Sequence, residues 1–176
     1  FKIVDDYPKD CRKVRFWDIA STVPSGKRDP DYTVGTLLGE KDGIYYVIDV
    51  IRGRWGPGSV EEIICQTAML DGVGTTVGFE QEVGAGARLF FASLYRRLAG
   101  FVIHKEIPRG AKIERARPFL VQAEVGNVRL VKGAWIRDWL NEITAFPYVD
   151  HDDQLDSVAG AFNTMAKSNA RRLYVF

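Results

Sequence analysis

The segment VRFWDIAS, residues 14–21, decides the fold class of this chain. Side chains alternate along a β-strand, so Val14, Phe16 and Asp18 fall on one face of it. An acidic residue in line with two apolar ones is unusual, because burying an unpaired carboxylate costs several kcal/mol. We therefore expect a core strand whose Asp18 either meets a cation or lies at an exposed strand end.

Two more strands follow a loop rich in proline, glycine and charge at residues 22–31. The segments YTVGTLLGE (32–40) and IYYVIDVIR (44–52) flank Asp42-Gly43, which is a strong hairpin signal. The chain is thus predicted to open with three antiparallel neighbouring strands. A helix is predicted from Ser59, which stands in capping-box spacing with Glu62.

The remaining pattern alternates strands and helices. Strands are expected at 75–81, 101–106 and 126–133, and helices at 85–100, 134–146 and from the aspartates at 150–156 onward. Residues 114–125 are ambiguous. This order predicts an α/β protein with a mixed central sheet flanked by helices.

Composition sets the frame for this fold. The chain has 176 residues, 46% hydrophobic and 27% charged, which suits one domain over residues 1–176. No apolar run reaches the roughly 18 to 20 residues of a membrane span, so we expect a soluble protein. The net charge of +1 argues neither for nor against a nucleic-acid partner.

Four aspartates crowd the start of the last predicted helix, at positions 150, 152, 153 and 156. The helix dipole favours acids in a first turn, which can explain Asp153 and Asp156 without any further role. At about 100° per residue, Asp152 lies near the edge of the apolar face and Asp153 lies nearly opposite it. Asp152 is therefore expected to look toward the sheet.

A divalent cation would relieve the repulsion among these acids. Asp18 from the first strand, Glu80 from the end of a later strand and Asp152 from a helix start can form one oxygen-ligand set. Such ligands suit Mg²⁺ or Mn²⁺. Two ions about 3.5 to 4 Å apart can activate water and stabilise a leaving oxygen in phosphodiester hydrolysis.

Basic residues gather in PRGAKIERARP, residues 108–118, which is read as a loop. This stretch is either a solvated loop whose arginines pair with Glu106 or Glu114, or a surface for phosphates. Lysine and arginine contacts to phosphates give affinity without sequence information.

Taken in order, several segments resemble one family. RFWDIAS, DPDYTVGTLL, VGFEQEVGAGA, AKIERARPFLVQAEVGNVRLVKGAW, WLNEITAFP and HDDQLDSVAGAF are similar to the C-terminal nuclease domain of the terminase large subunit, the DNA-packaging motor of tailed bacteriophages. The resemblance implies an RNase H-like, resolvase-like fold. It also implies metal-dependent cleavage of double-stranded concatemeric DNA with little sequence preference, carried out with two Mg²⁺ or Mn²⁺ ions.

The resemblance also implies roles for particular residues. Asp18 is the first acid, Glu80 the second, and the third lies within His151–Asp153. The helical argument prefers Asp152, while Asp153 can touch the second metal or orient a water. His151 is either a neighbour of the helix cap or a ligand. Asp31 either resembles an acid near the family's site or starts a strand. The residues that resemble the family's DNA-facing segment are Arg109, Lys112, Arg115 and Arg117.

The implied setting is the cytoplasm of an infected bacterial host. Nothing in the chain fits the phosphate loop GxxxxGK[ST], so the motor's ATPase domain is expected upstream in a parent protein, with the portal and the small terminase subunit as partners. Two alternatives stay open. One is a non-catalytic DNA-gripping or docking module, and the other is a Holliday-junction resolvase of the same fold.

Overall fold

The computed structural model describes residues 1–20, 31–80, 84–108 and 110–173, so the loop predicted at 22–31 lies almost wholly outside the described residues. The strands form one sheet in the order β1-β7-β4-β3-β2-β5-β6. Their bounds are β1 Lys2–Val4, β2 Arg12–Asp18, β3 Thr33–Lys41, β4 Ile44–Gly53, β5 Thr76–Glu80, β6 Ile103–Glu106 and β7 Val128–Val131.

Strand pairing makes the sheet mixed, as predicted. Strands β2, β3 and β4 are antiparallel neighbours, which confirms the expected opening of the chain. The pairs β2/β5, β5/β6, β4/β7 and β1/β7 are parallel. The sequence pattern gave no prediction of β1, which has only three residues and an exposed start.

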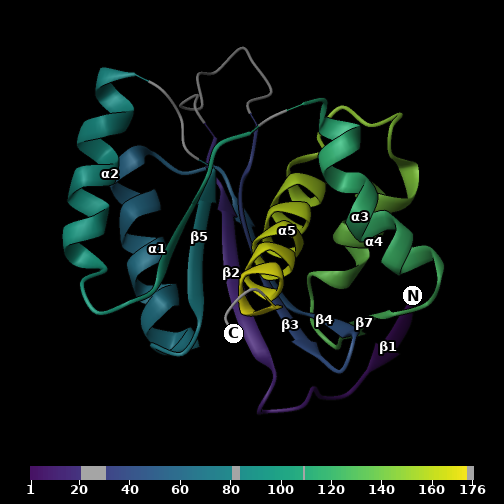
Figure 1. Ribbon diagram of the computed structural model, residues 1–176. Coiled ribbons are helices and arrows are strands. Elements are labelled where there is room, and N and C mark those ends of the chain that lie inside the picture. The colour runs from purple at the N-terminus through teal and green to yellow at the C-terminus, as the bar shows by residue number, and fades with distance from the viewer. Residues whose placement is uncertain (21–30, 81–83, 109, 174–176) are drawn as a thin grey trace.

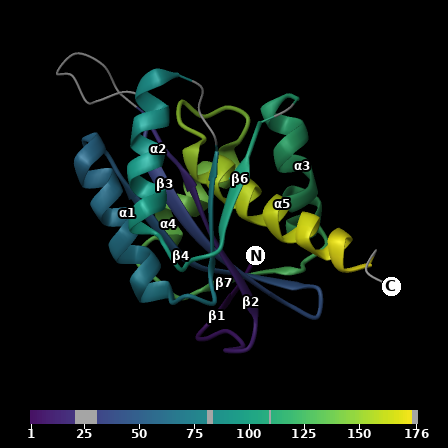
Figure 2. The same ribbon diagram turned by 60° about the vertical axis from the view of Figure 1, so that its left-hand side comes forward.

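Helices cover both faces of this sheet (Figures 1 and 2). Helices α1 (Pro57–Asp71) and α2 (Ala85–Arg97) lie on one face. Helices α3 (Lys112–Glu124), α4 (Ile136–Ala145) and α5 (Asp153–Leu173) lie on the other, with α5 running obliquely across the sheet. Among the described residues, no helix combines the length and the apolar character needed to cross a membrane.

Strand β2 separates two hydrophobic cores, as its alternation predicts. Phe16 is buried in the core under α5, together with Leu155 and Val158 of that helix. Trp17 points the other way, into the core under α1 and α2, and is fully buried. Asp18 follows on the same face as Phe16, so the strand delivers its acid to the α5 side.

A buried arginine ties β2 to α1. The side chain of Arg15 is almost completely buried and makes two hydrogen bonds to Asp71 at the end of α1, of 2.7 and 2.9 Å. It also donates to the Gly35 carbonyl and to Asp49. Because every partner is a carboxylate or a carbonyl, this buried charge is compensated.

Two sequence predictions about helix starts are wrong. Helix α1 begins at Pro57 without a side-chain cap, and Glu62 binds Gln66 and Arg97 instead of pairing with Ser59. The predicted basic loop 108–118 is helical from Lys112 onward. Packing explains the second error, because burial of Phe119 stabilises the helix despite an internal proline.

Helix α5 approaches β2 closely at Gly160. A Cβ built there would lie 2.2 Å from a ring atom of Phe16. We expect Gly160→Ala to lower the free energy of unfolding by about 1 to 3 kcal/mol, because the packed core cannot take the added methyl group. Gly86→Ala on α2 is the control, since its Cβ meets nothing within 4 Å and should be neutral or stabilising. Urea unfolding compares the two, and equal effects would contradict the close-packing argument.

Candidate active site

The acids predicted from the sequence lie at one edge of the sheet. Parallel strands end at the same edge, and the parallel pair β2 and β5 ends at Asp18 and Glu80. Helix α5 also begins at this edge, at Asp153, next to the start of α3 (Figure 1). Four elements far apart in the sequence therefore place charged side chains together.

Asp18 lies among the other acids of this group. Burial raises the pKa of its carboxyl well above the usual range, and the charges of Asp156, Asp153 and Glu80 raise it further. Lys112 opposes this shift. A carboxylate whose neighbours are three other carboxylates is a site that binds a proton, or another cation, more tightly than an isolated aspartate does.

Lys112 is the cation that lies between two of the acids. Its ammonium forms ion pairs with both Asp152 and Asp156. Partial burial alone would lower the pKa of Lys112, but the hydrogen bonds to these aspartates outweigh burial and the pKa rises. The ammonium therefore stays charged and compensates part of the acidic cluster.

Arg115, one turn further along α3, bridges the same cluster. One guanidinium nitrogen lies 3.1 Å from Glu80 Oε2, and the other lies 3.6 Å from Asp156 Oδ1. Sequence reasoning offered Glu106 or Glu114 as partners for these basic residues. Glu106 instead binds His104 and Lys167, and Glu114 accepts a hydrogen bond from the Ala111 N–H.

Asp153 does not point away from the sheet, so the helical-wheel expectation for it is wrong. Its side chain is buried, and it accepts a hydrogen bond of 3.0 Å from the backbone N–H of Tyr32. Burial raises the pKa of Asp153, and Asp31 adds to that rise while the Tyr32 N–H opposes it. A helical wheel identifies the face of a helix that packs on its main partner. The first turn of α5 is also contacted from another side, by Tyr32 just before β3.

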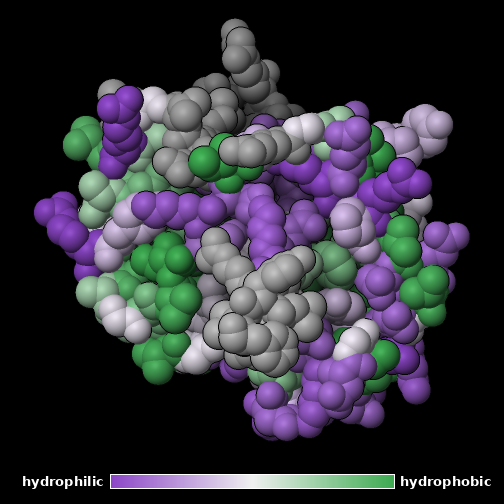
Figure 3. Space-filling view, in the orientation of Figure 1, coloured by the Kyte–Doolittle hydropathy of each residue, from purple (hydrophilic) through white to green (hydrophobic). Residues whose placement is uncertain are grey.

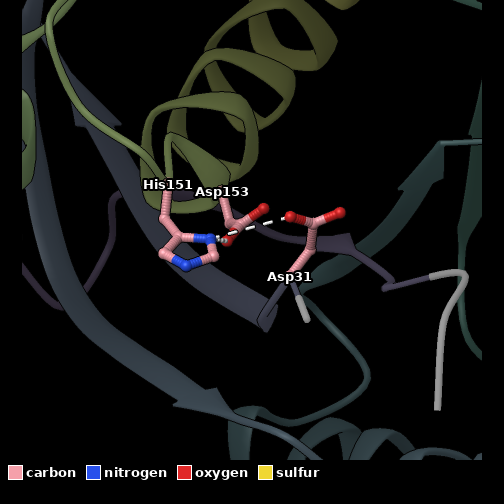
Figure 4. Close-up of side chains that lie close together, drawn as sticks. All are labelled: Asp31, His151 and Asp153. Carbon is pink, nitrogen blue, oxygen red and sulfur yellow. Dashed lines mark ion pairs between the residues drawn. The ribbon is translucent and has the colours of Figure 1, made fainter. Parts of the chain in front are cut away.

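His151 joins two acids beside this turn (Figure 4). Its Nδ1 lies 3.6 Å from Asp31 Oδ1 and 3.7 Å from Asp153 Oδ2. One ligand atom from each of the three residues lies within 4.8 Å of the others, a spacing that suits a metal ion. The structure thus brings Asp31 and His151, both ambiguous in the sequence, to the same side chain, Asp153.

Aromatic and guanidinium groups surround this histidine, and sequence reasoning missed them. The Tyr32 ring meets His151 edge-on, with ring centroids 5.4 Å apart. The guanidinium groups of Arg52 and Arg54 lie 3.6 and 3.9 Å from the centre of the Tyr32 ring. Arg52 ends the predicted hairpin strand and Arg54 lies just beyond it, and nothing local in the sequence pattern there marks a contact with residue 151.

A groove leads away from the acids between β6, α3 and α5. It encloses about 580 Å³, and Glu80, Arg115 and Asp156 line it at the acidic cluster. Lys105 and Lys167 line it as well. Figure 3 shows hydrophilic residues gathered across the middle of this face.

The four residues predicted to face DNA stand in different places. Lys112 and Arg115 contact the acids, and Arg117 is exposed on α3. Arg109 lies outside the described residues. DNA binding by these residues stays a prediction.

Known proteins resemble this chain in sequence and in fold. Residues 15–164 match the family model of the terminase RNaseH-like domain. No curated protein sequence matches the chain. The fold is similar to the Mn-soaked, inhibitor-bound human cytomegalovirus terminase nuclease domain, with a TM-score of 0.66 and 13% identity over 92% of this chain and 86% of that one.

Two further solved structures share the fold. The large terminase nuclease of thermophilic phage G20c with bound magnesium has a TM-score of 0.63 and 18% identity, covering 91% of this chain and 85% of that one. The fowlpox virus resolvase in complex with Holliday junction DNA has a TM-score of 0.56 and 10% identity, covering 89% and 98%. These identities support the fold alone, but the family match extends over most of the sequence. The chain therefore belongs to the family of terminase RNase H-like domains, as its motifs predict.

Proposed function

We propose that this chain is a metal-dependent endonuclease that cuts double-stranded DNA. One observation carries the proposal: Asp18, Glu80, Asp153 and Asp156 come from three elements and are close enough for their charges to raise the pKa of Asp18. Family membership supports it. Perturbed carboxylates gathered at one edge of a sheet are typical of catalytic sites.

The side chains fit Mg²⁺ or Mn²⁺. The donors around Asp18 are carboxylate oxygens, which these hard cations prefer, and the compensating charges within the described residues are the movable side chains of Lys112 and Arg115. We propose that Asp18, Glu80 and Asp152 hold the ions and that Asp153 contacts the second one. Two bound ions supply activation of a water and stabilisation of the leaving 3′ oxygen.

Within this proposal, the basic residues of α3 change partners. When a divalent ion compensates Asp152 and Asp156, Lys112 and Arg115 are released to bind phosphate oxygens of DNA. The DNA backbone then lies along the groove between β6 and α5, which has Lys105 and Lys167 on its walls. Contacts of this kind are independent of base sequence, which agrees with cleavage of low sequence preference.

We propose further that residues 1–176 form one nuclease domain of a packaging motor. In that setting the substrate is concatemeric viral DNA, and the ATPase domain belongs to a longer parent protein. The portal and the small terminase subunit are the partners, and the host-cell cytoplasm is the compartment. The resemblance of the sequence motifs to the terminase large subunit supports this setting.

Cleavage of plasmid DNA tests the proposed function. The purified protein is incubated with supercoiled plasmid in Mg²⁺, Mn²⁺, Ca²⁺ or EDTA, and linear and nicked products are separated on a gel. We expect cleavage in Mg²⁺ or Mn²⁺ and none in EDTA. DNA binding without cleavage in any of these metals would favour the gripping module, in which the acids only stabilise the fold.

A resolvase is the second candidate, and the structural similarity to the fowlpox virus enzyme favours it. The two activities differ in substrate. A four-way junction and a linear duplex of equal length and composition are compared at the same metal and salt concentration. Equal or faster cleavage of the duplex is the result expected here, and strong preference for the junction would replace the packaging function with resolution.

Lys112 gives a prediction that links metal and DNA. We expect Lys112→Met to bind Mn²⁺ about tenfold more tightly, because the ion no longer has to displace an ammonium from Asp152 and Asp156. The slope of log K for DNA binding against log salt concentration should become shallower by about one, the value for one phosphate contact. Calorimetry and binding assays at several salt concentrations measure the two effects.

Lys105→Met is the matched control for this variant. It also removes one positive charge, here from the wall of the groove, but Lys105 lies over the Tyr95 ring rather than between the acids. Mn²⁺ affinity should therefore stay at the wild-type value. Equal gains in Mn²⁺ affinity in both variants would mean that the gain comes from the change in net charge alone. That result would contradict the exchange of the Lys112 ammonium for the metal ion.

A further inference from the structure

Asp152 stands where an aspartate normally caps a helix. Helix α5 begins at Asp153, and the Asp156 N–H donates to the Asp152 carbonyl in the first helical hydrogen bond. An aspartate at this position usually accepts, through its side chain, an N–H of the first turn. The side chain of Asp152 instead forms an ion pair with Lys112.

A carboxylate from another helix does the capping. Glu142 Oε1 accepts the backbone N–H of Gln154 at 2.7 Å and that of Leu155 at 3.2 Å. Its Oε2 accepts the side-chain amide of Gln154 at 2.7 Å. Glu142 is only 7% exposed, and its negative charge faces the positive end of the α5 dipole.

Because Glu142 caps α5, the side chain of Asp152 is not needed as the cap. Glu142 already accepts the N–H groups that Asp152 would otherwise bind. The Asp152 carboxylate can therefore turn toward Lys112 and the acidic cluster. Asp153 is likewise engaged elsewhere, by the Tyr32 N–H. A buried cap from α4 also fixes the first turn of α5 relative to the sheet edge.

We propose that Glu142 is a positioning residue, which caps α5 in place of Asp152 and thereby keeps the Asp152 carboxylate directed at the metal site. The proposal rests on the proposed nuclease function. Among the described residues, Glu142 binds Gln154 and Leu155 rather than the acids around Asp18, so it acts through the first turn of α5. Residues that orient metal ligands in this way typically change metal affinity by about 10- to 100-fold when mutated.

Metal affinity of variants tests the proposal. We expect Glu142→Ala to weaken Mn²⁺ binding by about 10- to 100-fold in calorimetry, because Asp152 returns to the vacant N–H groups. Glu142→Gln, which keeps an acceptor oxygen at the cap, should retain most of the affinity. Ile143→Ala is the control for stability, since it empties a buried position of the same helix without touching the cap. Equal losses in Ile143→Ala and Glu142→Ala would overturn the positioning role.

A double-mutant cycle shows whether Glu142 acts through Asp152. In an Asp152→Asn background, Glu142→Ala should cause little further loss of Mn²⁺ affinity, and a full additional loss would overturn the proposal. A metal-free measurement separates this inference from the nuclease function. In EDTA at fixed pH, the ¹³C shift of the Asp152 carboxyl should move in Glu142→Ala and stay unchanged in Ile143→Ala. If wild type binds no Mn²⁺, the nuclease proposal fails, whereas an unmoved carboxyl signal refutes the role of Glu142 alone.

Discussion

We expect Asp18→Asn to abolish the proposed metal-dependent cleavage, with a loss of at least about a thousandfold, which corresponds to about 4 kcal/mol of transition-state stabilisation. The amide keeps the shape of the side chain but removes the charge at the centre of the carboxylate cluster. Plasmid cleavage in Mn²⁺, with wild type at equal concentration, measures the effect. Retained cutting within about tenfold would remove Asp18 from the proposed site.

The same variant should fold at least as well as wild type when no metal is present. Burial and the charges of Asp156, Asp153 and Glu80 raise the pKa of Asp18, so the folded state binds its proton more tightly than the unfolded chain does. The metal-free stability contributed by this group is greatest below the ordinary aspartate pKa of about 3.9. It is lost as pH rises toward the raised pKa of the folded state.

Thermal unfolding in EDTA over a series of pH values checks this sign. Wild type should lose stability as pH rises above the ordinary aspartate range, and Asp18→Asn should lose less, since Asn carries no charge. Lower stability of Asp18→Asn than of wild type at neutral pH would show that the amide disturbs the fold. Its loss of cleavage would then say nothing about metal binding.

The sheet and its central acid could be predicted because the signals are local. Alternation in residues 14–18 places Phe16 and Asp18 on one face and Trp17 on the other, and the structure has this arrangement. The Asp42-Gly43 turn fixes the hairpin that follows, with both residues at positive φ. Each of these features depends on neighbours only a few residues away.

Features set by distant contacts were missed or read wrongly. The sequence pattern predicts a loop where α3 begins, because the stability of this helix comes from packing of Phe119 against other elements, which a local pattern does not reveal. The direction of Asp153 depends on the N–H of Tyr32, the residue before β3, which lies more than a hundred residues earlier in the sequence. The cap from Glu142 cannot be predicted from the sequence pattern either, since it depends on how α4 and α5 pack in the folded chain.

The identity of the third acid is the second prediction with a large effect. Asp152, Asp153 and Asp156 all lie in the first turn or just before it, but they differ in what holds them. Asp152 is the most exposed of the three side chains, at 27%, against 9% for Asp153 and 10% for Asp156. Within the part of the chain that the structure describes, Asp152 forms one ion pair, to Lys112, which is the easiest of these contacts to exchange for a metal ion.

We therefore expect Asp152→Asn to lose cleavage by about a thousandfold, the largest effect of the three. Asp156 is paired with both Lys112 and Arg115, so Asp156→Asn should cost only about tenfold, by releasing two cations next to the site. Asp153→Asn should fall between them, because the Tyr32 N–H and His151 hold its carboxylate beside the cluster.

Single-turnover cleavage and Mn²⁺ calorimetry on the three variants separate a ligand from a neighbour. A true ligand loses both metal affinity and cleavage, whereas a residue that only balances charge changes affinity modestly and in the direction of the charge removed. If Asp156→Asn lost as much of both as Asp18→Asn does, Asp156 would replace Asp152 as the third ligand. In that case the role of Lys112 would be to compensate the charges of Asp152 and Asp156 at the start of α5 when no metal is bound.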